Sequence, residues 1–220
     1  MNKVDEVFKL NEKYEMHDHN GVYNKISNLK IIKGNIPIIL SAPHSVRQFR
    51  NNHFKQSDGL TGGLVEFLSY DKDVFGITRI HNKLDDPNSS NISLAMNYKR
   101  AIIDLINNYD INYLFDIHGC SNKHDFAIDI GTNNYSNIND FNDIDMLIKH
   151  FSILGKVTVD NKFKATSDTN VSRYINRVTG ISCFQLEISE QTRFYNTELL
   201  IDSLEGIIDE IKSKVLKKSK

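Results

Sequence analysis

The sequence predicts an α/β domain of three layers, in which helices cover both faces of a mixed, mostly parallel sheet. Short apolar runs typical of buried strands recur along the chain. Longer segments whose apolar residues are spaced by three or four positions lie between them. Such alternation of strands and helices is typical of layered α/β proteins.

The predicted strands are short, and two of them have a histidine near or just after their carboxyl end. The run at 36–40 continues into Ser41-Ala42-Pro43-His44-Ser45, and the run at 113–119 contains His118 near its end. A continuous apolar run indicates a strand that is buried on both faces. The full set is 36–40, 74–80, 113–119, 126–130, 155–159 and 181–188.

Helical spacing occupies the segments between these strands, namely 64–70, 92–109, 144–154, 170–178 and 197–215. The first 28 residues are polar and irregular, with a helical turn over 4–10 and a turn at Asn20-Gly21. We expect this segment to be peripheral, either packed across the sheet or frayed. Because no repeat or linker interrupts the chain, we expect residues 1–220 to form a single domain.

Composition argues against several classes of partner. The 220 residues carry 27 basic and 28 acidic side chains, so the broad basic field of a nucleic-acid-binding protein is not expected. No apolar stretch approaches the roughly 18 residues needed to span a membrane, and the N-terminus lacks the apolar region of a signal peptide. We therefore expect a cytoplasmic protein whose Cys120 and Cys183 are thiols.

Three predicted strands present a histidine or a carboxylate at or near the carboxyl end, where open α/β sheets bind their ligands. These residues are His44, His118 and Glu187. Glu187 lies among apolar residues and shares one strand face with Cys183 and Gln185, which makes that face polar. A glutamate paired with a lysine or arginine is the structural alternative.

The spacing of Asp116 and His118 places both side chains on one side of their strand. An aspartate behind a histidine is the usual way to orient a metal-bound imidazole. A catalytic zinc ion takes three protein ligands and a water molecule, so two histidines leave one ligand to be found. The candidates are Asp58, in a glycine-rich loop that follows His44, and Glu66 on the next helix. We favour Asp58, although an aspartate there also suits a turn or a helix cap.

These motifs resemble the N-formylglutamate amidohydrolase-like family, relatives of the zinc carboxypeptidases. The resemblance runs from about residue 36 to residue 194 and rests on PHS around His44, the acidic loop at Asp58, DIHG around His118 and QLEIS around Glu187. It implies a zinc-carboxypeptidase-like (phosphorylase/hydrolase-like) fold. In that fold His44, Asp58 and His118 would hold zinc, and Glu187 would be the general acid and base. The HxxE pair of the carboxypeptidases is absent, because Arg47 stands three positions after His44.

The resemblance also implies that arginines hold a carboxylate of the substrate. Arg193, six residues after Glu187, is the first choice to act beside it, and Arg79 and Arg173 are further candidates. The relatives carry an arginine-bearing segment after their second strand, which the stretch around Asn82 matches loosely. The expected activity is zinc-dependent cleavage of an amide bond in a small N-acyl amino acid or a peptide bearing a carboxylate.

Two alternatives compete with this interpretation. In a thiol hydrolase, Cys120 would be the nucleophile and His118 or His124 its base. In a catalytically degenerate member of the same fold, the chain would bind a carboxylate or peptide without turnover.

Overall fold

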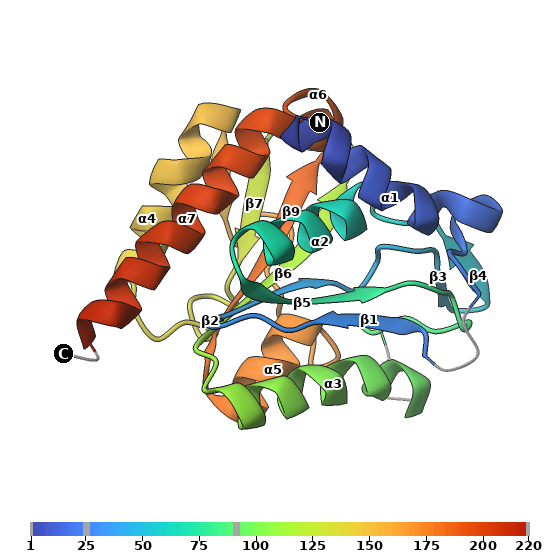
Figure 1. Ribbon diagram of the computed structural model, residues 1–220, viewed down its shortest axis with the longest axis horizontal. Helices are drawn as coiled ribbons and strands as arrows, with labels where there is room; N and C mark the ends of the chain where they lie inside the picture. The colour runs from blue at the N-terminus through green and yellow to red at the C-terminus, as the bar shows by residue number, and fades with distance from the viewer. Residues whose placement is uncertain (1, 24–26, 90–92, 219–220) are drawn as a thin grey trace.

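The computed structural model describes residues 2–23, 27–89 and 93–218, and it is built on one seven-stranded sheet (Figure 1). The strand order is β1-β5-β2-β6-β9-β7-β8. The strands are β1 (Leu29–Ile32), β2 (Ile36–Ala42), β5 (Val74–Arg79), β6 (Tyr113–Cys120), β7 (Ile128–Gly131), β8 (Val157–Val159) and β9 (Ser182–Ser189). The central strands β5, β2, β6 and β9 are parallel, whereas β1 and β7 pair antiparallel with their inner neighbours. The predicted mixed, mostly parallel sheet is confirmed.

Helices cover both faces of this sheet (Figure 1). One face carries α1 (Lys3–His19), α2 (Thr61–Asp71), α4 (Asn142–Phe151) and α7 (Thr197–Lys218), and the other carries α3 (Ser93–Tyr109) and α5 (Val171–Thr179). The core is correspondingly divided into two hydrophobic clusters, and β2 contributes Ile38 and Leu40 to one and Ile39 to the other. Because both faces are buried, the central strands are apolar at successive positions, as the sequence predicted.

The predicted elements are present with ends shifted by a few residues, and the differences lie at the edges of the fold. The first segment, expected to be irregular apart from a helical turn over 4–10, forms α1, which is kinked at Met16, His17 and Asp18. The edge strand β1, the hairpin of β3 (Gln48–Arg50) and β4 (His53–Lys55), and the short helices η1 (Ser152–Leu154) and α6 (Glu190–Tyr195) complete the structure. Ile92, the first residue of the helix predicted at 92–109, lies outside the described residues.

Two glycines in the first turn of α2, Gly62 and Gly63, allow α1 and α2 to pack closely. A Cβ atom on Gly62 would lie 2.6 Å from Cε2 of Tyr14, and one on Gly63 would lie 2.4 Å from the carbonyl oxygen of Val7. Side chains at these positions would push the two helices apart, so α1 packs closely because both residues are glycine. Within the part of the chain that the structure describes, no helix is both long and apolar enough to cross a membrane.

Candidate metal centre and active site

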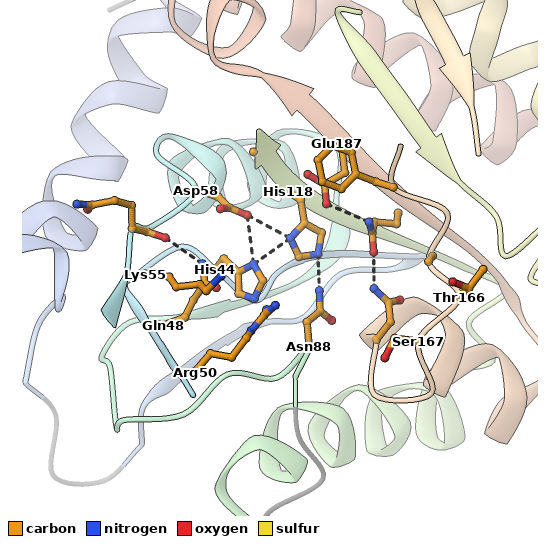
Figure 2. Close-up of a pocket in the computed structure, with 16 residues that line it drawn as sticks. His44, Gln48, Arg50, Lys55, Asp58, Asn88, His118, Thr166, Ser167 and Glu187 are labelled. Carbon is orange, nitrogen blue, oxygen red and sulfur yellow. Dashed lines mark hydrogen bonds and ion pairs between the residues drawn. The ribbon is translucent and has the colours of Figure 1, made fainter. Parts of the chain in front are cut away.

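His44, Asp58 and His118 meet at the carboxyl ends of two neighbouring parallel strands (Figure 2). His44 follows β2, His118 lies in β6, and Asp58 comes from the loop before α2. The Nδ1 atoms of the two histidines are 3.1 Å apart, and Oδ2 of Asp58 lies 3.3 Å from Nδ1 of His44 and 3.1 Å from Nδ1 of His118. Two imidazole nitrogens and one carboxylate oxygen therefore face a common point.

Backbone hydrogen bonds hold Asp58 in this position. Its N–H donates to the carbonyl oxygen of His44 at 2.8 Å, and its own carbonyl oxygen accepts from the hydroxyl of Thr61 at 2.7 Å. The other candidate, Glu66, is fully buried beneath α1, where Lys13 and Lys30 pair with it. The structure thus brings Asp58 to the histidines and leaves Glu66 in the contact between α1 and α2.

Each histidine is oriented by a buried carboxylate on its other ring nitrogen. Nε2 of His44 donates to Oδ1 of Asp86 at 3.0 Å, and Nε2 of His118 donates to Oδ2 of Asp116 at 3.0 Å. Asp116 in turn accepts a hydrogen bond from the hydroxyl of Ser41 at 2.7 Å. These contacts fix both imidazoles in the tautomer that leaves Nδ1 free to bind a metal ion.

The donor set fits zinc. Ligand atoms held about 2.0–2.1 Å from a tetrahedral zinc ion lie about 3.3 Å apart, close to the separations of 3.1–3.3 Å among the two Nδ1 atoms and Oδ2 of Asp58. Two imidazoles with one carboxylate is also the ligand set of catalytic zinc sites that keep a fourth position for water. His44, Asp58 and His118 would therefore hold the ion.

The electrostatics of the centre favour a bound cation. Burial alone would lower the pKa of His44, but Asp86 and Asp58 outweigh it and raise that pKa. For His118, Asp116 and Asp58 likewise outweigh burial and hold the pKa well above its ordinary value. Burial opposes ionisation of Asp58, yet the two histidines keep its pKa well below the usual range. Closely spaced carboxylates thus create a negative potential that favours positive charge.

Glu187 lies beside the centre because β9 pairs with β6 and places Glu187 opposite His118. Burial raises the pKa of Glu187 to about 7, with Asp58 adding to the rise and His118 opposing it. Its Oε1 atom accepts a hydrogen bond of 3.0 Å from the side-chain amide of Gln185. A carboxyl group with such a pKa can both accept and donate a proton near neutral pH.

These residues line a cleft of about 470 Å³ (Figure 2). The β3–β4 hairpin adds two cations, Arg50 and Lys55, to its wall. Arg50 directs Nε and Nη2 to Oδ2 of Asp86, each at 2.6 Å, and 31% of its side chain remains exposed. Asn88 lies at the cleft too, with its amide nitrogen 3.1 Å from Nε2 of His118.

Sequence reasoning did not select Arg50, Asp86 or Asn88. The available signal is Asp85-Asp86-Pro87-Asn88, which follows the second predicted strand and continues the stretch around Asn82 that loosely matches the arginine-bearing segment of the relatives. In the fold this stretch crosses the carboxyl ends of the strands and supplies Asp86 to His44.

The residues predicted to bind substrate lie elsewhere. Arg79 is fully buried, where it pairs with Asp85 and donates to the carbonyl oxygen of Pro43. Asn82 bonds to Asn20 and to the backbone N–H of Leu84. Arg173 pairs with Asp168 at the surface. The cleft is lined by none of Arg79, Asn82 and Arg173, because each reaches these partners in its own part of the fold.

Arg193 approaches the centre from behind instead of entering the cleft. Its Nε donates to the carbonyl oxygen of Gly59 at 2.8 Å, and Nη1 donates to the carbonyl oxygens of Cys120 and Ile188. It packs so closely on Gly119 that a Cβ atom there would lie 2.4 Å from Cζ of the arginine. Arg193 therefore joins the loop of Asp58 to the ends of β6 and β9, which is a positioning role.

The sheet order and the helices on both faces define a three-layer α/β fold with a mixed, mostly parallel sheet, and the candidate metal centre lies at the carboxyl ends of its central strands. No family model and no curated protein matches the sequence. Among solved structures, the chain is similar to an N-formylglutamate amidohydrolase from Ralstonia eutropha JMP134, with a TM-score of 0.62 and 10% identity over 88% of this chain and 100% of that one. It is also similar to a bacteriophage poly-gamma-glutamate hydrolase, with a TM-score of 0.54 and 15% identity over 90% of this chain and 94% of that one. At such identities the similarity shows the fold, and at that level the predicted resemblance is confirmed.

Proposed function

We propose that this protein is a cytoplasmic, zinc-dependent amidohydrolase that cleaves an amide bond in a small N-acyl amino acid or a peptide bearing a carboxylate. The observation that carries the proposal is the convergence of His44, Asp58 and His118 beside Glu187, at the carboxyl ends of β2, β6 and β9. The similarity in fold to an amidohydrolase and a poly-gamma-glutamate hydrolase supports the same reaction class.

His44, Asp58 and His118 would hold a zinc ion, which would supply a Lewis acid for the scissile carbonyl group and lower the pKa of the attacking water towards 7. Glu187 takes the proton of the attacking water. Since Oε1 is held by Gln185, the proton is carried on Oε2 and passes from there to the leaving amide nitrogen. Asp86 and Asp116 keep the two imidazoles in place through the reaction.

The cations of the cleft account for the carboxylate in the proposed substrate. Arg50 and Lys55 both line it, whereas Arg79, Asn82 and Arg173 do not. Within the part of the chain that the structure describes, Asp86 accepts from Nε and Nη2 of Arg50, so Nη1 would be the donor for a second carboxylate. We therefore transfer the predicted carboxylate contact to Arg50, assisted by Lys55.

The thiol alternative is disfavoured by the surroundings of Cys120. The side chain is buried, and burial together with the negative charge of Glu187 raises the pKa of its thiol to about 12. A nucleophilic cysteine needs the thiolate, which surroundings of this kind suppress at neutral pH. The binding-only alternative predicts that Glu187→Gln leaves ligand affinity intact and that no turnover exists to lose.

The test is the metal content of untagged protein purified without chelator, measured by elemental mass spectrometry. We expect about one zinc ion per chain, lost in His44→Ala and in His118→Ala but kept in His53→Ala, which removes an exposed histidine outside the centre. Zinc-loaded protein should then hydrolyse N-acyl amino acids or peptides, and Glu187→Gln should not. Protein that stays metal-free after incubation with zinc would overturn the proposal.

A further inference from the structure

A second cleft adjoins the first on the far side of Asp58. It has a volume of about 450 Å³ and shares Gln56, Asp58 and Gly119 with the cleft that contains the histidines and Glu187. Asp58, the one metal ligand common to both, thus stands at their junction. The two clefts therefore adjoin at the candidate metal centre, with Asp58 lining both.

The second cleft is a built part of the fold. The end of α1 forms one wall, where His19 lies 3.3 Å from the hydroxyl of Ser57 and accepts a hydrogen bond on its carbonyl oxygen from the N–H of Arg47. Ser121, after β6, and Glu190, at the start of α6, also line the cleft. The N-terminal segment, expected to be peripheral, thus brings His19 to the lining of the second cleft.

The charges of the two clefts differ. Arg50 and Lys55 add positive charge to the first. The second exposes Glu190, while its own arginine, Arg193, is 5% exposed and donates to backbone carbonyl oxygens. In the first cleft an anionic group is therefore favoured at Arg50 and Lys55 and disfavoured at Asp58 and Glu187, whereas Glu190 disfavours a further anion in the second.

Each cleft alone falls within the range of about 300–1,000 Å³ that encloses a whole small ligand. A single N-acyl amino acid would leave one of them empty. We infer that the substrate is an extended, peptide-like chain that occupies both clefts, with its carboxylate beside Arg50, and that an internal amide bond is cleaved at the junction. This inference rests on the proposed function and narrows its substrate class.

The test compares N-acetylglutamate with acetyl-Glu-Ala-Ala, linked through either glutamate carboxyl group, and with acetyl-Ala-Ala-Glu. We expect zinc-loaded protein to cleave at least one peptide at an internal bond, located by mass spectrometry, with kcat/KM at least about tenfold above that for N-acetylglutamate. Ser121→Trp should fill the second cleft and reduce kcat/KM for that peptide at least about tenfold, while hydrolysis of N-acetylglutamate changes less than about twofold. Ser213→Trp, at an exposed position of α7 away from both clefts, is the matched control and should change neither.

Binding gives an independent readout. In the Glu187→Gln background, where the peptide is not cleaved, calorimetry should show that Ser121→Trp raises the Kd of the peptide at least about tenfold. Equal kcat/KM for N-acetylglutamate and the peptides, or an equal effect of Ser121→Trp on both, would overturn the inference and leave the amidohydrolase proposal standing. Absence of zinc and of all hydrolysis would instead overturn the proposed function and this inference with it.

Discussion

Replacing Asp86 with asparagine tests the metal centre without touching a proposed ligand. Oδ1 of Asp86 accepts the hydrogen bond from Nε2 of His44 at 3.0 Å, and Oδ2 accepts from Arg50 at 2.6 Å. The asparagine keeps the shape but removes the charge, and its NH₂ group must face either the imidazole N–H or the guanidinium. Loss of such a carboxylate usually weakens metal binding about 10–100-fold, which corresponds to about 1.4–2.7 kcal/mol.

The measurement is a zinc titration against a competing chelator, with thermal unfolding as a check on the fold. Asp85→Asn is the matched control, because Asp85 is also a buried aspartate paired with an arginine, Arg79, but does not contact a histidine of the centre. It should lower the free energy of unfolding by about 3 kcal/mol and leave zinc affinity unchanged. Unchanged affinity in folded Asp86→Asn, or an equal loss in Asp85→Asn, would refute the reasoning.

Four further predictions follow from individual side chains. Glu187 must be ionised to take a proton, and a bound cation would lower its pKa, so kcat/KM should rise with pH and level off at or below about pH 7. A rise of kcat/KM that continues above pH 8 would contradict this prediction. Cys120→Ser should keep most activity, and iodoacetamide should not inactivate the native protein at pH 7; rapid inactivation would revive the thiol mechanism. Arg193→Lys should lower the melting temperature with KM nearly unchanged, whereas a large rise in KM alone would indicate substrate contact. Burial lowers the pKa of Lys99 to about 8, so between pH 8 and 10.5 the unfolded chain binds a proton at this lysine and the folded chain does not. Chemical denaturation should therefore show a free energy of unfolding that rises by up to about 3 kcal/mol over this pH range. The same rise in Lys99→Met would contradict this prediction.

The central sheet could be predicted from the sequence because its strands are buried on both faces and carry the continuous apolar runs that mark them. The edge strand β1 and the β3–β4 hairpin were not predicted, although the other edge strand, β8, was. Strand β1 is only partly buried and all three residues of β4 are exposed, so neither has a distinctive apolar pattern. Helix α1 buries only Val7, Asn11 and Tyr14, and its close packing depends on Gly62 and Gly63 far along the chain. Contacts between residues so far apart in the sequence cannot be predicted from the local spacing of apolar residues.

The two histidines among the proposed ligands could be predicted because neighbouring parallel strands bring their carboxyl ends together. A histidine at each of two such ends therefore lies close to the other. Asp116 was found because it lies two residues from His118 on the same strand. Asp86 was missed because it meets His44 from 42 positions away and comes from a loop without regular spacing.

The choice among arginines shows what sequence spacing does not contain. A guanidinium that binds substrate must keep donors open to the cleft, whereas a structural one directs them to groups of the protein. Arg79 is fully buried and Arg193 is 5% exposed, and both donate to backbone carbonyl oxygens as well as to any charged partner. Arg50 keeps 31% of its side chain exposed and lines the cleft, although the sequence places it on an unremarked hairpin. Because backbone carbonyl oxygens are present at every residue, the sequence does not reveal which arginines they engage, and only the folded arrangement separates Arg50 from the other two.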